Sequence, residues 1–499
     1  MQHAEPPYFI GIDIGTSSAK SVAFSSHGEP LKEASEAYPL DRPETEAATQ
    51  DAEVVFRAAM NSLRNLVQKM GYVPTAIGLS SAMHSLMAVD SDGHPLSPLI
   101  TWADGRAQQQ AELLRSTPLG MDLYHRSGTP VHAMSPLCKL AWLRNKKPEL
   151  FQRAYRFIGI KEYLLFRLFG KWVIDHSIAS ATGMFDLNAR SWIPDALQYA
   201  GLDAERLSDP VSVTFQLTDM QQDLATTLGI PPNIPWIIGA SDGCLANLGA
   251  GDLPHDAAVL TIGTSGAIRM TVSQPVQDPE GRLFCYILNE DRYVIGGPSN
   301  NGGVVWEWFC RQFYPEKSMD EVFREVQRIS PGAEGLLFLP YLYGERAPVW
   351  DAGARGYFWG IGAGHSRAHF ARAVLEGICL NLYQITQALI TLGGPIRLIH
   401  ADGGFTQSPV WIQILANVLG IPLVVSSNPH ASAKGAALLA MSATGHSPEM
   451  QDEQQENKVY TPEEKEHQSY KKIFERFKKI YPTVKAMEDD PNQPSAKVS

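Results

Sequence analysis

The stretches YFIGIDIGTSSAKSVAFSS (residues 8–26) and AAVLTIGTSGAIRMTV (residues 257–272) decide the fold of this chain. In each, an apolar β-rich run leads into a polar Gly-Thr-Ser turn, and a second β-rich run follows. The pattern predicts two strands joined by a tight turn, rather than a strand that leads into a helix. Its recurrence in the second half of the chain indicates an internal duplication at the level of architecture.

The rest of the chain predicts an α/β protein with two domains. A chain of 499 residues is long for one core, because single hydrophobic cores stop growing at roughly 250–300 residues. Helical spacing over 54–70, a strand-like run over 75–84, a hairpin over 86–100 and a strand, glycine loop, helix and strand over 396–425 alternate as in α/β folds. We divide the chain into an N-terminal domain (1–248), a C-terminal domain (249–446) and a terminal segment (447–499).

The terminal segment contains one clear pattern. Residues 461–482 read as an amphipathic helix, with Tyr470, Ile473, Phe474 and Phe477 spaced for one face. Acidic residues are mixed with the basic ones, which favours a packing helix over a membrane-surface helix. A polar linker precedes this helix, and we expect about 13 residues after it to be disordered.

Composition excludes several classes of partner. Hydrophobic residues make up 44% of the chain, and the formal net charge of −11 gives no field that would attract nucleic acid. No stretch approaches the ~20 apolar residues of a membrane span, and no leader-like segment begins the chain. The five cysteines are scattered, as is typical of buried reduced thiols. We expect no nucleic acid, no membrane and a cytoplasmic location.

Both Gly-Thr-Ser turns are candidate phosphate sites. The turn at Gly15-Thr16-Ser17 offers N–H groups and hydroxyls to an anion, and Asp13 lies close enough to hold a hydrated Mg²⁺. A second turn at Gly263-Thr264 would grip a polyphosphate from the other side. The alternative is an ordinary hairpin turn that needs glycine for its backbone. No GxxxxGK[ST] motif occurs, so a Walker-type loop is excluded.

Two further loops follow apolar strands. Asp242 stands among small residues, where its carboxylate would act as the general base that takes a proton from an acceptor hydroxyl. The competing interpretation is an Asp that caps the next helix. Gly403 and Gly404 stand ahead of a helix, which suits adenosine or its phosphates, although an ordinary strand-to-helix turn has the same pattern.

A polar cluster over residues 83–106 suits a polyhydroxylated ligand. Trp102 would stack on the apolar face of a sugar chain, while His84, Asp104 and Arg106 would hydrogen-bond its hydroxyls. Surface loop residues are the alternative interpretation. The sequence therefore predicts a kinase that acts on a small polyol or sugar acid, as opposed to a protein that only binds nucleotide.

Three motifs resemble the FGGY carbohydrate kinases. They are MSPLCKLAWLRN (134–145), PYLYGERAPVWDAGARG (340–356) and GYFWGIGAGHSRAHFARAVLE (356–376). The resemblance spans nearly the whole chain. It implies two actin-like ATPase (ribonuclease H-like) domains with an active-site cleft between them, and it implies ATP and Mg²⁺ as cofactors.

The resemblance also implies roles for individual residues, at the positions that match the family's motifs. The resemblance implies that Asp13 and Asp242 hold the metal and that Asp242 is the base. The nucleotide positions that it implies are Gly15, Thr16, Ser17, Lys20, Gly263, Thr264, Gly303, Gly404 and Ser408. The sugar positions that it implies are His84, Trp102, Asp104 and Arg106.

Within the family, the stretches SSAMHSLMAVD, ITWADGRA, IKEYLLFRLFG and IGASDGCLANLGAG are most similar to gluconate kinases. That similarity implies transfer of phosphate from ATP to D-gluconate, which gives 6-phospho-D-gluconate. Xylulose or another pentulose is the alternative acceptor, and a homodimer is the assembly that we consider. An actin-like ATPase that phosphorylates no small molecule is a remote alternative, because it would not need the polyol cluster. Gluconate carries a carboxylate, for which Arg106 or Lys161 would supply the countercharge.

Overall fold

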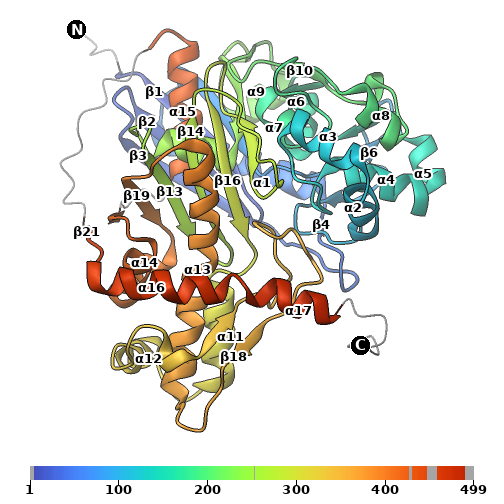
Figure 1. Cartoon of the computed structure of the whole chain (residues 1–499). Helices are drawn as coiled ribbons and strands as arrows, with labels where there is room; N and C mark the ends of the chain where they lie inside the picture. Colours follow the sequence, from blue (N-terminus) through green and yellow to red (C-terminus); the bar gives the residue numbers. More distant parts are fainter. Residues whose placement is uncertain (1–4, 252, 426–429, 447–457, 489–499) are drawn as a thin grey trace. The chain divides into compact units, whose positions relative to one another are not determined.

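The structure is a computed structural model that describes residues 5–251, 253–425, 430–446 and 458–488 (Figure 1). By their contacts these residues form two compact units. The first holds the described parts of 1–252, 271–295 and 428–454, and the second those of 253–270, 296–427 and 455–499. The linear division at residue 248 stays a proposal. The tail predicted to be disordered and the polar linker up to residue 457 lie outside the described residues.

A six-stranded mixed sheet forms the centre of the first unit, in the order β11-β12-β5-β1-β2-β3. Its strands are β1 (Tyr8–Ile14), β2 (Ser18–Ser25), β3 (Pro30–Ala37), β5 (Ala76–Ser81), β11 (Gln216–Leu217) and β12 (Trp236–Ser241). The predicted hairpin is confirmed, because β1 pairs antiparallel with β2. Strands β1, β5 and β12 are parallel, so they end at the same edge of the sheet.

Alternate residues of β1 enter two separate cores, because successive side chains of a strand point to opposite faces. Ile10 and Ile12 belong to a buried cluster with helix α1 (Ala52–Met70). Phe9 belongs to a second cluster with helix α15 (Ala431–Ala443), which comes from far along the sequence. Figure 1 shows α15, coloured red, beside the blue strands β1 and β2.

The close approach of α15 requires glycine on two strands. A Cβ atom on Gly11 would lie 1.8 Å from the carbonyl oxygen of Ala433, and one on Gly78 would lie 2.1 Å from that of Ala436. Any larger residue at these strand positions would overlap the helix backbone. Glycine on β1 and β5 and small residues on α15 therefore allow this helix to cover the sheet.

The other elements of the first unit surround this layer. Its other helices are α2 (Gln108–Arg115), α3 (Pro118–Ser127), α4 (Pro136–Lys146), α5 (Pro148–Arg153), α6 (Ile160–Phe169), α7 (His176–Ser180), α8 (Pro194–Ala200), α9 (Gln222–Leu228) and α10 (Asp242–Gly249). Its other strands are β4 (Thr49–Gln50), β6 (Met87–Val89), β7 (Leu99–Ile100), β8 (Arg156–Ile158), β9 (Val173–Asp175), β10 (Asp209–Val211) and β15 (Phe284–Ile287). The predicted helix over 54–70 and the predicted strand over 75–84 are both confirmed.

The hairpin predicted over residues 86–100 is only partly correct. Its turn forms, with Gly93 at φ 81°, and isolated bridges connect its two arms. However, β6 pairs with β8 and β7 pairs with β4. The strand residues of both arms, 87–89 and 99–100, are buried, and strands from elsewhere in the first unit supply the longer pairings.

The second unit repeats the pairing pattern of the first. Strand β13 (Ala257–Ile262) is antiparallel to β14 (Gly266–Val272) and parallel to β19 (Leu398–Asp402). Strand β19 is in turn parallel to β20 (Leu423–Val425), which pairs with β21 (Lys458–Tyr460). The predicted internal duplication is therefore confirmed at the level of strand pairing.

A long helix, α13 (Arg367–Gly393), forms the core of the second unit. Within the part of the chain that the structure describes, it is the one helix long and apolar enough to cross a membrane, but 83% of its most apolar window is buried inside the structure. The remaining elements are β16 (Tyr293–Ser299), β17 (Leu337–Leu339), β18 (Tyr357–Trp359), α11 (Gly303–Phe313), α12 (Met319–Val326), α14 (Pro409–Leu419), α16 (Glu464–Phe477) and α17 (Ile480–Glu488). Burial of this kind is typical of a core helix.

Two predictions about packing are confirmed. Helix α16 buries Tyr470, Phe474 and Phe477, and the Tyr470 hydroxyl donates to Glu376 Oε1 of α13 at 2.8 Å. It is therefore a packing helix. All five cysteines are free and buried.

Candidate active site

The common edge of β1, β5 and β12 brings Asp13 and Asp242 to nearby positions in the first unit. Asp13 lies opposite Ser80 in the register of β1 and β5, and Ser241 of β12 lies opposite Ser81. Neighbouring strands lie about 4.8 Å apart, so the ends of β1 and β12 are separated by about 10 Å. Strand ends at this spacing leave room between them for a phosphoryl group and a cation.

One carboxylate oxygen of Asp13 accepts a hydrogen bond within the described residues, and the other does not. The Ser80 hydroxyl donates to Asp13 Oδ1 at 2.7 Å. Burial raises the pKa of Asp13, and the Ser80 hydrogen bond and the charge of Lys20, which lies opposite Asp13 on β2, act against that effect. Among the residues that the structure describes, none donates to Oδ2. A half-buried carboxylate with one oxygen that accepts no hydrogen bond is well suited to a cation.

The turn between β1 and β2 directs its carbonyl oxygens into the protein. The Tyr38 hydroxyl donates to Gly15 O at 2.6 Å, and the backbone N–H of Tyr38 donates to Ser17 O at 3.0 Å. Gln50 Nε2 donates to Thr16 O at 2.7 Å. Within the described ranges, no acceptor contacts the N–H of Thr16 or Ser17. Backbone N–H groups left free in this way suit an anion such as a phosphate.

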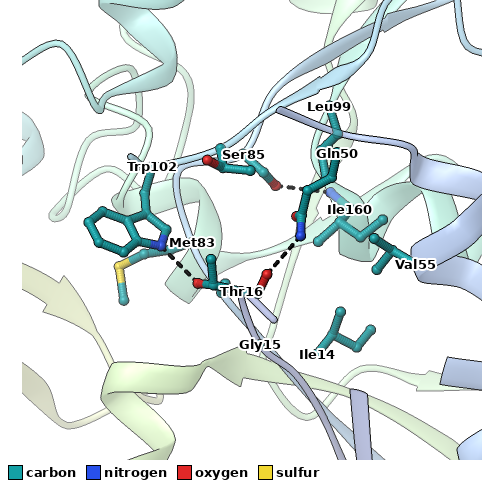
Figure 2. A pocket seen from close by; sticks show the side chains of 12 residues that line it. Ile14, Gly15, Thr16, Gln50, Val55, Met83, Ser85, Leu99, Trp102 and Ile160 are labelled. Atoms are coloured by element: carbon teal, nitrogen blue, oxygen red, sulfur yellow. Dashed lines mark hydrogen bonds between the residues drawn. The ribbon is translucent and has the colours of Figure 1, made fainter. Parts of the chain in front are cut away.

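Trp102 connects the predicted sugar cluster to the same turn. Its Nε1 donates to Thr16 Oγ1 at 2.9 Å. Figure 2 shows Trp102 and Gln50 reaching Thr16 from two sides of a pocket that Met83 and Ser85 also line. The structure therefore brings a predicted sugar residue and a predicted phosphate residue into direct contact.

Asp104 and Arg106 form a rigid pair. Arg106 donates from Nε to both carboxylate oxygens, at 3.1 and 3.0 Å, and its Nη2 lies 2.8 Å from Asp104 Oδ2. Asp104 also accepts the Ala48 N–H at 2.9 Å, and Arg106 reaches Glu44 at 3.1 Å. The guanidinium carbon lies 4.6 Å from the centre of the Trp142 ring. The orientation of this arginine is therefore fixed from several sides.

His84 has an unusual backbone. It is a non-glycine residue at φ 67°, a conformation that costs energy and is found disproportionately at functional sites. The residue is 7% exposed, and its Nδ1 lies 2.8 Å from the carbonyl oxygen of Ala181. This strained backbone was not predicted from the sequence.

Lys139 holds the two segments that carry the sugar cluster, and the sequence did not predict that role. This lysine of helix α4 is 1% exposed. Its Nζ donates to His84 O at 2.6 Å and to Thr101 O at 2.8 Å. The available signal was a single lysine within the otherwise apolar run PLCKLAWL. Tyr38 and Gln50, which hold the turn, gave no comparable signal.

Lys161 is buried behind the edge of the sheet. Its Nζ lies 2.7 Å from Asp175 Oδ2 and donates to Ala240 O at 2.9 Å. Burial lowers the pKa of Lys161, while the charges of Asp175 and Asp242 act in the opposite direction. The ammonium group is therefore already paired inside the protein.

Asp242 is the first residue of α10, and Ser241 is the residue at its N-cap position. Asp242 Oδ1 accepts the N–H of Gly243 at 2.7 Å. Its side chain is partly buried at the shared strand edge. Asp242 follows the apolar strand as predicted, but the predicted turn is absent because the helix begins at Asp242 itself, and Ser241 instead of Asp242 occupies the N-cap position.

In the second unit, the turn after β13 meets the N-terminus of α11. The Gly303 N–H donates to Gly263 O at 2.7 Å, and the Val304 N–H donates to Thr264 O at 3.2 Å. Gly263 and Thr264 are themselves exposed. Three of the predicted nucleotide positions therefore lie together, with Gly303 fixing the backbone of the turn.

The glycine loop after β19 lies beside this turn. A Cβ on Gly403 would lie 2.3 Å from Ile262 O, whereas Gly404 has open space around it. A 3₁₀ turn (Gly404–Gln407) separates the loop from α14, whose N-cap is Ser408. The Ser408 hydroxyl accepts the Trp411 N–H at 3.3 Å. Gly404 is thus open to a ligand, whereas Ser408 caps a helix.

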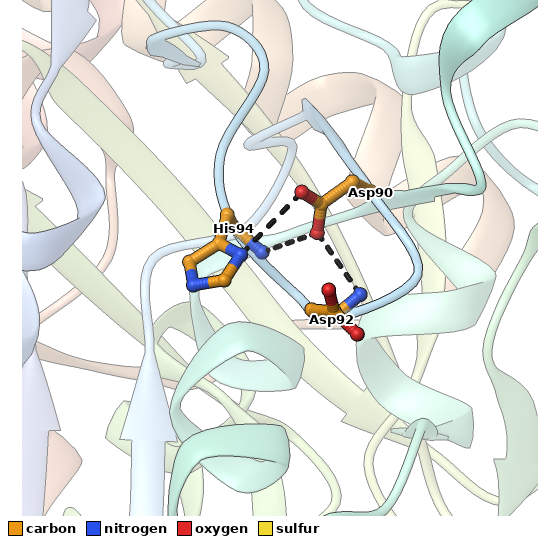
Figure 3. A group of neighbouring side chains, drawn as sticks. All are labelled: Asp90, Asp92 and His94. Atoms are coloured by element: carbon orange, nitrogen blue, oxygen red, sulfur yellow. Dashed lines mark hydrogen bonds and ion pairs between the residues drawn. The ribbon is translucent and has the colours of Figure 1, made fainter.

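A separate acidic group lies at the hairpin turn of residues 90–94. Asp90, Asp92 and His94 have ligand atoms within 4.8 Å of one another (Figure 3). Asp90 Oδ1 accepts the N–H groups of Asp92 at 3.0 Å and His94 at 2.8 Å. These hydrogen bonds are those of an Asp-stabilised turn, which accounts for the arrangement.

Sequence profiles of the FGGY family of carbohydrate kinases match the chain in two parts. The profile of the N-terminal domain matches residues 8–249, and the profile of the C-terminal domain matches residues 258–444. The predicted family and its two-domain α/β fold are both confirmed by these matches.

Individual relatives agree with this assignment. The chain is 41% identical over 450 residues to a gluconokinase from Bacillus subtilis (strain 168), covering 88% of each chain. It is 28% identical to the xylulose kinase of the same organism, covering 96% of this chain and 97% of that one. A solved gluconate kinase from Lactobacillus acidophilus matches with a TM-score of 0.92 at 36% identity, covering 97% and 99% of the two chains. The chain belongs to the FGGY family of carbohydrate kinases and is an ATP-dependent sugar kinase that transfers phosphate to an alcohol group.

Proposed function

We propose that this sugar kinase phosphorylates D-gluconate to 6-phospho-D-gluconate. The observation that carries the proposal is the difference in identity between its gluconokinase relative, at 41%, and its xylulose kinase relative, at 28%. The arrangement of Trp102 against Thr16 supports it, because it links a polyol-binding side chain to a phosphate-binding turn.

In the proposed mechanism, Asp242 accepts the proton of the acceptor hydroxyl. The hydroxyl oxygen forms a bond to the γ-phosphorus of ATP as the bond to the β–γ bridging oxygen breaks, and ADP leaves. The free N–H groups of Thr16 and Ser17 stabilise charge on the transferred group. Gly263, Thr264 and Gly303 hold the nucleotide phosphates.

Mg²⁺ is the cation that this mechanism needs. Asp13 and Asp242 are the residues that would hold it, and the Oδ2 of half-buried Asp13, which accepts no hydrogen bond from the described residues, fits that role. When bound, Mg²⁺ neutralises charge on the transferred phosphate. Lys20, opposite Asp13, adds positive charge on the same hairpin.

The carboxylate of gluconate requires a countercharge, and Arg106 is better placed than Lys161 to supply it. Both side chains pair with a buried aspartate, but that of Arg106 is 17% exposed, whereas that of Lys161 is 3% exposed. The hydrogen bonds that Arg106 donates to Asp104 and Glu44 leave other guanidinium N–H groups available to a ligand. Lys161 instead holds the end of β12, next to the proposed base.

An acceptor panel tests the proposal. ADP release is measured with MgATP and gluconate, xylulose, ribulose or glycerol at several concentrations. Gluconate should give the highest kcat/KM. A higher value for xylulose would replace gluconate with the alternative acceptor, and equal values would remove the argument for a dedicated sugar-acid site.

A further inference from the structure

Glu345 is a fully buried carboxylate in the second unit, and it has no role in the proposed mechanism. It is 0% exposed and lies in the loop between β17 and β18. Burial raises its pKa, and the hydrogen bonds that it accepts act against that effect. A buried acid of this kind is stable only when neighbouring groups satisfy its oxygens.

Donors from three segments surround this carboxylate. Its Oε1 accepts the N–H groups of Asn300 at 2.8 Å and Arg346 at 2.7 Å. Its Oε2 accepts the Ser299 hydroxyl at 2.7 Å and the Asn381 amide of α13 at 2.8 Å. The Asn301 amide adds a weaker bond to Oε2 at 3.2 Å. Each carboxylate oxygen therefore accepts at least two hydrogen bonds.

Most of these donors belong to the segment that ends β16 and begins α11. Asn301 is tied to the same loop by two further bonds, from its Nδ2 to Gly344 O at 2.7 Å and from the Tyr343 N–H to its Oδ1 at 3.2 Å. The Asn301 N–H in turn donates to Ser299 Oγ at 3.0 Å. The path of the chain from Ser299 to Asn301 is thus set by the loop that carries Glu345.

The next residues of this segment touch the phosphate turn. A Cβ on Gly302 would lie 2.5 Å from the carbonyl carbon of Ser265. The Gly303 N–H donates to Gly263 O at 2.7 Å. A shift of residues 299–301 would therefore move the backbone groups that define the turn.

We propose that Glu345 is a positioning residue for the nucleotide. It fixes Ser299 to Gly303, and through them the turn at Gly263 and Thr264, without touching ATP itself. This inference rests on the proposed nucleotide role of those positions.

A single-atom change tests it. In Glu345→Gln, either orientation of the amide places an NH₂ group against donors, because both carboxylate oxygens are acceptors here. If the glutamine oxygen faces the backbone N–H groups of Asn300 and Arg346, its NH₂ group faces the Asn381 amide. The Asn381 Oδ1 already accepts the Tyr341 hydroxyl at 3.1 Å, which opposes a flip of that amide, so the side chain or the segment must shift. The matched control is Glu307→Gln, which removes a charge from an exposed position on α11 itself.

The measurement is the Kd of MgADP by calorimetry, with KM for the best acceptor measured in parallel on full-length protein. We expect Glu345→Gln to raise the ADP Kd at least tenfold, to leave the acceptor KM within twofold and to keep a cooperative thermal transition. Glu307→Gln should change neither constant.

An ADP Kd within twofold of wild type in folded Glu345→Gln would overturn the inference, as would equal increases in both constants. If that variant does not fold, Ser299→Ala, which removes one donor, should raise the ADP Kd about threefold, and no change would overturn the inference. If the wild-type protein itself binds no ADP, both the proposed nucleotide positions and the positioning role of Glu345 are wrong. If wild type and variant bind ADP equally, only the positioning role fails.

Discussion

Replacing Lys139 with methionine removes the donor that holds both halves of the sugar cluster. Methionine keeps the length and apolar stem of the side chain and removes the bonds to His84 O at 2.6 Å and Thr101 O at 2.8 Å. Thr101 O keeps a second donor, the Asp104 N–H at 3.2 Å. The position of His84 should therefore change more than that of Thr101, because the His84 backbone is held in a strained conformation.

The size of the effect follows from the bonds that are lost. A hydrogen bond from a charged donor contributes about 1.5–3 kcal/mol. Burial lowers the pKa of Lys139 to about 7, so the amine is partly uncharged near neutral pH and the lower figure applies. A loss of about 1.5 kcal/mol at the sugar cluster corresponds to a roughly tenfold increase in acceptor KM.

The assay measures KM for gluconate and for ATP separately, at saturating concentration of the other substrate. Lys139→Met should raise the gluconate KM about tenfold and leave the ATP KM within twofold. Lys146→Met is the control, because Lys146 is exposed on the same helix. An unchanged gluconate KM in folded Lys139→Met, or equal changes for both substrates, would refute the reasoning.

Three further predictions follow from the first unit. Arg106→Met should raise the gluconate KM at least tenfold and the xylulose KM less, because only gluconate carries a carboxylate; parallel acceptor kinetics check this, and equal changes would count against the countercharge. Trp102→Phe keeps a ring but removes the 2.9 Å bond to Thr16, so kcat/KM should fall about three- to tenfold; unchanged kinetics would show that this contact is dispensable. Burial raises the pKa of Glu162 to about 7 from 4.5, so the folded state binds a proton that the unfolded state releases, and stability should fall by up to about 3 kcal/mol between pH 4.5 and 7. Urea unfolding of Glu162→Gln should show a smaller loss over that range, and an identical pH profile would contradict it.

Local sequence patterns were sufficient for the two hairpins. An apolar β-rich run on each side of a Gly-Thr-Ser turn predicts strand pairing from neighbouring residues alone, and both hairpins form. The position of Asp242 at the end of an apolar strand was predictable for the same reason, although the helix begins at Asp242 without the predicted turn. Such patterns depend only on neighbouring residues, and they hold in the folded protein because these residues do form paired strands of the sheets.

Long-range packing was not predictable in this way. Helix α15 covers β1 because glycine at Gly11 allows its backbone to approach, with a Cβ there only 1.8 Å from Ala433 O. Nothing in the run around Gly11 identifies a helix that begins at Ala431. The linear division of the sequence therefore placed α15 with its neighbours in the chain.

Buried polar networks were missed for a related reason. Lys139 was visible as a lysine in an apolar helix, but its acceptors are backbone carbonyls, which every residue has. Glu345 lies in a recognised motif, yet its donors Ser299 and Asn381 come from distant segments. The sequence can show that such a group is buried, whereas only the fold shows what it holds.

The most direct test of the account is the reaction of gluconate and MgATP with wild-type protein and with Asp242→Asn, followed by ³¹P NMR of the product. Wild type should form 6-phosphogluconate and ADP in equal amounts. Asp242→Asn should lose about 10²–10⁴-fold in kcat while its ADP Kd stays within a few-fold, because a general base acts in the chemical step. Turnover near that of wild type in Asp242→Asn, or ADP formed without a phosphorylated sugar acid, would contradict the account.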